Sequence, residues 1–392
     1  MRVLLVPNSY PPQIGGLEIA VSNIARELAA RGHRVIVVTT SPSVRPSTTE
    51  ETHAVRVYRL PLALPRLVFR AGKGKLAHSL VRILFSPVLA PLCLWEFVRI
   101  IKRERPDIVN LHYIADNALY VLAAQRFAEF KLVVNLHGND IERHSQRSWP
   151  SRWLTRTALH RADMVLSNSA HILAQAERIV PAVQSNSAVV GNGVHPEYFK
   201  TRERFQHDRP YILSIGNFGE KKGFDILLHA FAQVLREQPG VDLIMAGDGH
   251  ERGRCQRLAA QLGLGNAVVF LGRVDHSEVP ALLNGCELFV LPSRLEPFGI
   301  VVLEAMAAGR SIVAARVGGV PEIITHMKDG FLVDPESAEA LADGIDLLLS
   351  RPSLREQLGR RGRRTVAKRF TWAKICDRFE DAYCGLIGGS AP

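Results

Sequence analysis

Cysteines are few in this sequence and form no recognisable pattern. The five among 392 residues are scattered and include no C-x-x-C pair: Cys93, Cys255, Cys286, Cys376 and Cys384. A disulfide framework or a zinc site usually needs paired or closely spaced cysteines. We therefore expect neither, and predict buried thiols in a reducing compartment.

Long apolar segments and the common nucleotide-binding signatures are also missing. No segment offers the roughly 20 uninterrupted apolar residues that a membrane-spanning helix requires. No G-x-G-x-x-G follows the first apolar run, no P-loop motif occurs, and no D-x-D arrangement suggests a metal site. The short apolar run Arg2–Val6 ends at Pro7, so we interpret it as a strand rather than a signal peptide.

The composition is that of a soluble protein with two domains. Hydrophobic residues make up 47%, charged residues 22%, and the mean hydropathy is +0.04. These values exclude a disordered chain, and 392 residues suffice for two cores of ordinary size.

Positive charge is concentrated in the first half. The net charge is +11, and residues 1–200 carry 25 Lys and Arg against 14 Asp and Glu, whereas the two kinds balance in the remainder. Residues 62–105 mix basic and apolar side chains. This mixture fits an anionic membrane surface, and it also fits a helix packed on a sheet with a solvated basic face. Nucleic acid is disfavoured as a partner, because interleaved aromatic residues for base stacking are lacking.

The order of segments predicts an α/β protein with two Rossmann-like, doubly wound domains facing a central cleft. Strands are expected at Arg2–Val6, Val35–Thr39, Asp107–Leu111, Lys131–Leu136, Asp163–Leu166, Tyr211–Ile215, Asp242–Ala246, Val268–Leu271, Leu288–Leu291 and Ile312–Ala314. Such nearly continuous apolar runs between helices are typical of parallel sheets covered on both faces. We predict domains at 1–200 and 201–370, a closing helix within 371–392, and a linker over 196–210.

The segment Arg294–Ala308 carries the clearest chemical pattern. Glu296 and Glu304 are separated by seven residues, and Gly299 lies between them at the start of an apolar helix. The first amides of that helix, near Phe298–Ile300, would bind an anion such as a phosphate. Glu304 could accept hydrogen bonds from a diol. Both glutamates could instead be solvated, although the apolar surroundings of Glu304 disfavour this for a carboxylate that would need partners.

Three further loops follow expected strands. Ser214–Gly223 contains Lys222 and suits a diphosphate, but it also fits an ordinary helix entry. Gly15–Gly16 is either a close-approach loop or a plain turn. His137 to Asp140 closes a strand, and the carboxylate could set the tautomer of a functional His137; a structural histidine is the alternative.

Taken in order, these segments resemble the glycosyltransferases called group 1, or family 4, which have the GT-B fold. The resemblance covers nearly the whole chain. It is carried by the E-x7-E of Glu296 and Glu304 and by PPQIGGLE, HGND, GNGV, KKGFDILLHAF, AGDG and GGVPEII. It implies a retaining, metal-independent transfer from a nucleotide-diphosphate sugar, with UDP- and GDP-sugars first, to a saccharide or lipid-linked saccharide. It also implies that the closing helix crosses back to the first domain.

The resemblance assigns roles to residues of this sequence. It implies that Glu304 holds the ribose, that Glu296 contacts sugar hydroxyls and that His137 steadies charge at the reacting carbon. The other donor-binding residues would be Gly16, Asn217, Lys222, Arg273, Phe298, Gly299 and Ile300, with Glu18 and Asp140 on the acceptor side. Family members usually carry Arg where this chain has Asn217, which removes a permanent charge beside the diphosphate.

The resemblance implies a hexosyltransferase, which we expect to face the cytoplasm, and the charge pattern of residues 62–105 predicts a peripheral contact with the inner membrane face. No cofactor is expected besides the nucleotide sugar as co-substrate. The alternative is a weak or inactive sugar-nucleotide-binding protein, motivated by Asn217. A nicotinamide oxidoreductase is disfavoured because the dinucleotide fingerprint is lacking.

Overall fold

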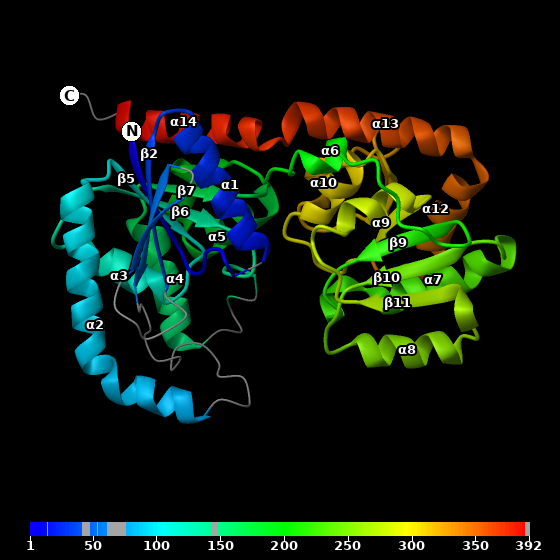
Figure 1. The fold of residues 1–392 in the computed structure, drawn as a ribbon, viewed down its shortest axis with the longest axis horizontal. Coiled ribbons are helices and arrows are strands. Elements are labelled where there is room, and N and C mark those ends of the chain that lie inside the picture. The colour runs from blue at the N-terminus through cyan, green and yellow to red at the C-terminus, as the bar shows by residue number, and fades with distance from the viewer. Residues whose placement is uncertain are drawn as a thin grey trace. The chain divides into compact units, whose positions relative to one another are not determined.

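The chain folds into two compact units. The computed structural model describes residues 1–13, 15–40, 48–52, 54–60, 76–142, 144 and 148–388 (Figure 1). The first unit comprises Met1–Gly191 with Ile375–Pro392, and the second comprises Asn192–Lys374. The predicted limits were 200/201 and 370/371, and the closing helix belongs to the first unit from Ile375 onward.

The first unit is built on an eight-stranded sheet in the order β3-β4-β2-β1-β5-β6-β7-β8. All neighbours are parallel except the edge pair β3 and β4, which is antiparallel. The strands are β1 Arg2–Pro7, β2 Arg34–Thr40, β3 Thr48–Thr52, β4 Val55–Leu60, β5 Ile108–His112, β6 Lys131–Leu136, β7 Met164–Ser167 and β8 Ser187–Val189. The predicted parallel sheet is thus confirmed apart from its edge.

Helices cover both faces of this sheet because most of its strands are apolar on both sides. The helices are α1 Gly16–Ala30, α2 Leu76–Glu104, α3 Asn117–Ala124, α4 Trp149–Arg161, α5 Ala170–Ile179 and α14 Trp372–Gly388, with a short 3₁₀ turn at Pro181–Ser185. One continuous core joins α2, α3, α4 and α5 to one face. On the other face, Nδ2 of Asn110 donates to the hydroxyl of Tyr383, which ties α14 to β5.

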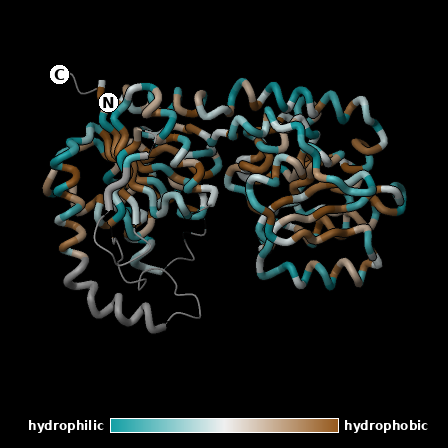
Figure 2. Tube along the Cα trace, in the orientation of Figure 1, coloured by the Kyte–Doolittle hydropathy of each residue, from teal (hydrophilic) through white to brown (hydrophobic). Residues whose placement is uncertain are grey.

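The second unit is a six-stranded, wholly parallel sheet in the order β11-β10-β9-β12-β13-β14. Its strands are β9 Tyr211–Ile215, β10 Asp242–Ala246, β11 Val268–Gly272, β12 Leu288–Leu291, β13 Ser311–Ala315 and β14 Phe331–Val333. Its helices are α6 Glu197–Lys200, α7 Phe224–Glu237, α8 Arg252–Gln261, α9 Val279–Gly285, α10 Ile300–Ala307, α11 Val320–Ile323, α12 Ala338–Ser350 and α13 Pro352–Arg369, with 3₁₀ turns at Glu220–Lys222 and Gly265–Ala267. The apolar strands run through the interior of each unit (Figure 2).

Every strand expected from the sequence is present within one or two residues at each end. Short elements were missed, among them β3, β8, β14 and α11, because three to five residues carry too little periodicity. The segment predicted as a linker contains α6, whose Tyr198 is buried. No helix in the described part of the chain is long and apolar enough to cross a membrane.

Three loops at the carboxyl ends of neighbouring strands pack without space between them. Gly223 follows β9 and has a left-handed φ of +62°, and a Cβ there would clash with the carbonyl oxygen of Pro292 after β12. Gly318 follows β13 with φ +53°, and a Cβ there would clash with the carbonyl oxygen of Glu296. Both positions therefore require glycine for two independent reasons.

We expect Gly318→Ala to cost more stability than Gly265→Ala. Both glycines have φ +53°, where alanine costs about 1 kcal/mol, but a Cβ on Gly265 meets open space. The clash at Gly318 should add about 2 kcal/mol, which urea denaturation of the two variants would measure. Equal losses would contradict the close packing of the Glu296 loop.

Candidate active site

The loops after β9 and β12 are joined by a latch that involves backbone and side chain. The carbonyl oxygen of Lys221 accepts hydrogen bonds from the amides of Arg294 at 2.7 Å and Leu295 at 3.2 Å. The Arg294 guanidinium donates two bonds to Asp225 in the first turn of α7, at 2.7 and 2.8 Å. These bonds hold the pKa of Asp225 below its ordinary value, although burial acts in the opposite direction. The latch fixes the two residues that follow it, Lys222 and Glu296.

Lys222 and Glu296 form an ion pair at this latch. The Nζ atom of Lys222 lies 2.6 Å from Oε2 of Glu296, and the Ser293 hydroxyl donates to the same oxygen at 3.4 Å. Glu296 is 7% exposed, whereas the Lys222 side chain is a quarter exposed. An ammonium group has three donors, so Lys222 can hold Glu296 and still bind a phosphate oxygen.

Glu304 lies on α10 and is buried with two aromatic partners. It receives a hydrogen bond from Tyr198 of α6, and Nε2 of His276, after β11, lies 4.0 Å from its Oε1. The Tyr198 hydroxyl is 3.3 Å from the same His276 nitrogen. Burial raises the pKa of Glu304 to about 8, a rise that the Tyr198 bond opposes and nearby Glu197 reinforces. Without a ligand, the carboxyl is therefore largely protonated at neutral pH.

The start of α10 lies between the two glutamates. Gly299 precedes the helix with φ +106°, and Ile300 is its first residue. Phe298 is buried with its ring 6.1 Å from that of Phe370. The first amides of a helix have no partner within it, so this end offers hydrogen-bond donors, and binding of a phosphate or a sugar oxygen there stays a prediction.

Asn217 and Arg273 are two other predicted donor-binding residues, and Asn217 follows Gly216, where a Cβ would lie 3.6 Å from the Lys222 side chain. Both follow strands of the same sheet, β9 and β11, and both are exposed. The structure brings Lys222, Glu296, Glu304 and the start of α10 together on adjoining segments, and gives Asn217 and Arg273 no bond to them. Their roles remain predictions.

In the first unit, His137 follows β6 in a loop that Asp140 organises. The buried Asp140 carboxylate accepts hydrogen bonds from the backbone amides of His137 at 3.1 Å, Gly138 at 2.8 Å and Ile114 at 3.4 Å. Burial raises its pKa to about 6, and those bonds act against the rise. The expectation that Asp140 sets the His137 tautomer is wrong, because it binds the backbone of that residue and not its ring. Asp140 positions the loop, and contact with an acceptor stays a prediction.

His137 has a different ring partner, His112 at the end of β5. Nε2 of His137 lies 3.2 Å from Nδ1 of His112, which is fully buried. Burial lowers the pKa of His137 to about 4. The ring is therefore neutral at physiological pH and can act as a hydrogen-bonding group without carrying charge.

The glycine loop near the start of the chain leads into α1. Gly16 is the first residue of that helix, and Glu18 in its first turn accepts a hydrogen bond from the Ser9 hydroxyl. A Cβ on Gly15 would clash with the Glu18 carboxylate. Gly15 therefore leaves room for the Glu18 carboxylate within the loop, and contacts of Gly16 and Glu18 with substrates remain predictions.

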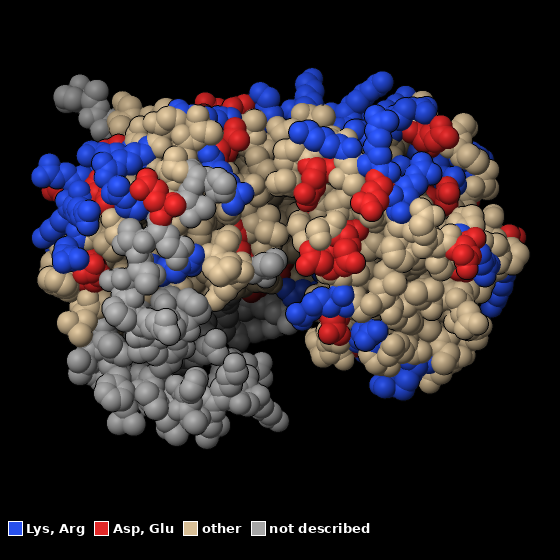
Figure 3. Space-filling model, in the orientation of Figure 1, with Lys and Arg blue, Asp and Glu red and all other residues tan. Residues whose placement is uncertain are grey.

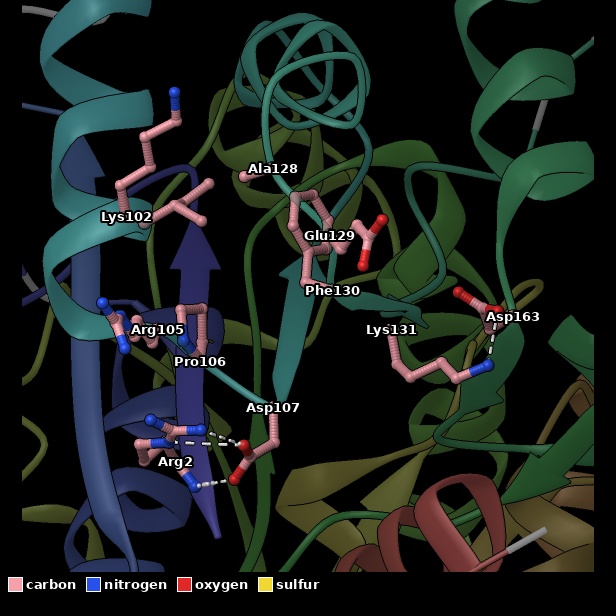
Figure 4. Close-up of a pocket in the computed structure, with 11 residues that line it drawn as sticks. Arg2, Lys102, Arg105, Pro106, Asp107, Ala128, Glu129, Phe130, Lys131 and Asp163 are labelled. Atoms are coloured by element: carbon pink, nitrogen blue, oxygen red, sulfur yellow. Dashed lines mark hydrogen bonds and ion pairs between the residues drawn. The ribbon is translucent and has the colours of Figure 1, made fainter. Parts of the chain in front are cut away.

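At the other end of its strands, the first sheet carries a cavity of about 890 Å³. It lies at the amino ends of the strands. Figure 4 shows that two acidic side chains of its lining form ion pairs with basic ones. Arg2 pairs with Asp107 at 2.7 Å, and Lys131 with Asp163 at 3.5 Å. Ligands of open parallel sheets bind at the carboxyl ends of the strands, so this cavity is no candidate for the transfer site.

No group of three His, Cys, Asp or Glu side chains in the described ranges is arranged to hold a metal ion. None of the five cysteines, all of which lie within the described residues, is in a disulfide, and four of them are buried as predicted. Cys384 is the exception, because it lies on an exposed position of α14.

Sequence reasoning missed the residues that support the predicted ones. Arg294 and Asp225 flank the motif residues, and a basic and an acidic residue next to two ligand loops could have suggested a latch. Tyr198 and His276 gave no signal, since they come from a short helix and a loop far from Glu304 in sequence.

Two Rossmann-like units, each built on a mainly parallel sheet, are the architecture of the GT-B fold. Solved structures share it: sucrose-phosphate synthase of Thermosynechococcus elongatus matches with a TM-score of 0.78 at 23% identity, covering 100% of both chains. Anabaena HepE, crystallised with UDP and glucose, matches with a TM-score of 0.74 at 22% identity, covering 97% of this chain and 98% of its own.

Family models match both units. The glycosyl transferases group 1 model matches residues 197–365, and the glycosyl transferase 4-like domain matches residues 15–193. Curated relatives include glycogen synthase of Mycobacterium tuberculosis, 29% identical over 99% of this chain and 96% of its own. Another is a GDP-mannose-dependent phosphatidylinositol monomannoside mannosyltransferase of Mycolicibacterium smegmatis, 27% identical over 94% and 95%. The chain belongs to the group 1, or family 4, glycosyltransferases.

Glu304 should make the protein less stable as the pH rises. Its pKa moves from an ordinary 4.5 to about 8 on folding, so the folded state binds the extra proton between these values. The stability present below pH 4.5 should decline toward pH 8 by at most about 1.4 kcal/mol per pH unit. Denaturation of Glu304→Gln, which cannot titrate, should show a flatter decline.

The matched control is Glu203→Gln, which changes an exposed glutamate of the same unit. It should leave the pH dependence of wild type unchanged. If Glu304→Gln and wild type lost stability in parallel from pH 5 to pH 8, the carboxyl would have to be ionised in the folded protein.

Proposed function

We propose that this protein is a retaining glycosyltransferase. It moves a hexose-type sugar from a nucleotide-diphosphate sugar to a saccharide or lipid-linked saccharide acceptor. The observation that carries the proposal is the ion pair between Lys222 and Glu296, 2.6 Å apart on latched loops. The buried carboxyl of Glu304 lies on α10, the helix that directly follows the Glu296 loop. A cation, a sugar-binding carboxylate and a diol-binding carboxyl are thereby fixed before any ligand arrives.

In this proposal each group meets one part of the donor. Lys222 and the first amides of α10 bind the diphosphate, whose charge they offset. Glu304 binds the ribose hydroxyls, and Glu296 binds hydroxyls of the sugar. Because Lys222 is already held by Glu296, donor binding exchanges solvent around the ammonium for phosphate oxygens and leaves the ion pair in place.

The transfer itself exchanges one C–O bond for another. The bond between the anomeric carbon and the β-phosphate oxygen breaks, and a bond to the acceptor hydroxyl oxygen forms on the same face. The departing phosphate oxygen takes the proton of the acceptor hydroxyl. His137, neutral because its pKa is about 4, steadies the positive charge that develops at the reacting carbon through hydrogen bonding.

The relatives support a UDP- or GDP-linked donor. HepE was crystallised with UDP and glucose, and the name of the Mycolicibacterium smegmatis relative specifies GDP-mannose. In this proposal, protein groups alone stabilise the negative charge of the departing nucleoside diphosphate. We expect no metal or other cofactor to be required, because Lys222 and the helix start already supply positive charge.

An inactive nucleotide-sugar-binding protein remains the second candidate, and a specific residue favours it. Asn217 stands in the glycine loop after β9, where the resemblance implies arginine, and it is exposed and neutral. A charge-assisted contact is worth roughly 1.5–3 kcal/mol. Binding without sugar transfer or donor hydrolysis would establish this second candidate.

Calorimetric titration with UDP, GDP, ADP and dTDP, without metal, tests the donor site. One nucleotide should bind selectively, and Lys222→Ala should weaken it about 10- to 100-fold because a charge-assisted bond is lost. Lys222→Ala should weaken binding of the corresponding nucleoside monophosphate less, since that ligand lacks the second phosphate. Glu304→Ala should weaken binding of the monophosphate and the diphosphate equally.

Lys221→Ala is the matched control, because that residue contributes its backbone carbonyl to the latch. It should bind nearly as tightly as wild type. Equal losses for Lys221→Ala and Lys222→Ala would mean that only general positive charge matters, and an absence of binding to all four nucleotides would remove the proposed donor site.

Peripheral membrane contact is a further part of the proposal, with the protein facing the cytoplasm. Leu92 and Trp95 lie on one face of α2 and are 57% and 61% exposed, and the Arg99 guanidinium lies 5.2 Å from the centre of the Trp95 ring. Lys and Arg side chains gather over this part of α2 (Figure 3). Exposed apolar groups beside basic ones suit anionic lipid. Residues 62–75 of the predicted segment lie outside the described residues.

Sedimentation with anionic and neutral liposomes tests this contact. Leu92→Ala combined with Trp95→Ala should lower partition onto anionic vesicles about tenfold, or roughly 1.4 kcal/mol. Met327→Ala, which removes an exposed apolar side chain of the second unit, should have no effect. Equal partition of wild type onto neutral and anionic vesicles would contradict the proposed contact with anionic membranes.

A further inference from the structure

His112 is a buried histidine that no predicted role accounts for. It ends β5, is fully buried, and faces His137 with ring centres 5.4 Å apart and ring planes tilted by 38°. The Nδ1 of His112 lies 3.2 Å from the Nε2 of His137. A polar ring buried this deeply costs free energy unless its hydrogen bonds are made, so the contact with His137 is a specific one.

Two neighbours restrict the His112 ring. Asn135 pairs with His112 across β5 and β6, and its side-chain nitrogen lies 3.1 Å from the same Nδ1. From α14, the Phe379 ring lies 6.4 Å away at a tilt of 31°. The amide holds the ring edge and the phenyl ring limits its rotation, so His112 presents a fixed nitrogen to His137.

Both imidazoles are neutral at physiological pH. Burial lowers the pKa of His112 well below its ordinary value, and the neighbouring His137 lowers it further. Two neutral rings that meet through one nitrogen each share a single proton. The side-chain nitrogen of Asn135 faces Nδ1 of His112, and an amide nitrogen can only donate, so we assign that Nδ1 as the acceptor and Nε2–H of His137 as the donor. This assignment places the proton of His112 on its own Nε2.

We propose that His112 is a positioning residue that fixes the ring plane and tautomer of His137. The shared hydrogen bond places the proton of His137 on Nε2 and leaves its Nδ1 as an acceptor. That acceptor can take a hydrogen bond from a sugar hydroxyl and offer electron density near developing positive charge. The inference rests on the proposed function of His137 in sugar transfer.

The cluster also gives the last helix a role in the site. His112 is confined by Phe379, and Tyr383 one turn further on accepts from Asn110, two residues before His112 on β5. The orientation of His137 therefore depends on residues more than 200 positions later in the sequence. The Nε2 of His112 has no hydrogen-bond partner among the described residues, so the contact with His137 and Asn135 through Nδ1 is what orients this ring.

The test uses two variants of the full chain. His112→Asn keeps a polar group close to the position of Nδ1, whereas His112→Leu removes it and keeps the site apolar. Nitrogen-15 spectra of histidine-labelled protein, with His137→Gln to assign the signals, report the tautomer directly. We expect His137 protonated on Nε2 in wild type and His112→Asn, and a mixture of tautomers in His112→Leu.

Kinetics with the nucleotide sugar selected by calorimetry provide the second readout. The kcat of His112→Leu should fall roughly 10–100-fold, as when a supporting partner of a functional histidine is lost. The donor KM should change less than about twofold, because the contacts that bind the donor in its ground state are unchanged. His112→Asn should recover most of the kcat.

The two readouts separate failure of the inference from failure of the proposed function. An unchanged tautomer and kcat in His112→Leu would overturn the positioning role. A wild type with Nδ1-protonated His137 would overturn the proton assignment. If His137→Gln transferred sugar as fast as wild type, the role of His137 would fail, while the spectra would still decide whether His112 positions its ring.

Discussion

The bidentate contact between Arg294 and Asp225 is the interaction on which the second unit's site depends. It joins the loop after β12 to the first turn of α7, and the Lys221 carbonyl reinforces it with two backbone bonds. Because the same loops carry Lys222 and Glu296, their ion pair is a consequence of the latch. Both latch side chains are about 30% exposed, so the bond's value lies in geometry more than in stability.

In both units, burial holds functional side chains in their neutral forms. Each collects polar side chains at the carboxyl ends of buried parallel strands, where water is largely excluded. In the first unit burial keeps His112 and His137 neutral. In the second it raises the pKa of Glu304 to about 8, with Tyr198 as hydrogen-bond partner. Groups that are neutral and held by neighbours need little reorganisation when a ligand arrives.

Much of the fold and part of the site follow from the sequence. The apolar runs predict the central strands, and the glycine loops after β9 and β12 predict where Lys222 and Glu296 lie, because parallel strands end at one edge. The partners of those residues could not be predicted. Tyr198 reaches Glu304 from a four-residue helix, and Asp140 turns to backbone amides rather than to the His137 ring. Such contacts depend on tertiary packing, which leaves no local period in the sequence.

Hydrogen exchange of the full chain, measured with and without saturating nucleoside diphosphate, tests the central claim most directly. If the latched loops form the donor site, added protection should concentrate at residues 216–223 and 293–304, and the amino-terminal edge of the first sheet should be unchanged. At a nucleotide concentration close to the wild-type Kd, where a 10- to 100-fold loss of affinity leaves the variant mostly unbound, Lys222→Ala should show little of this protection. Protection that centred on residues 101–107 and 128–131, around the charged cavity, would contradict the account.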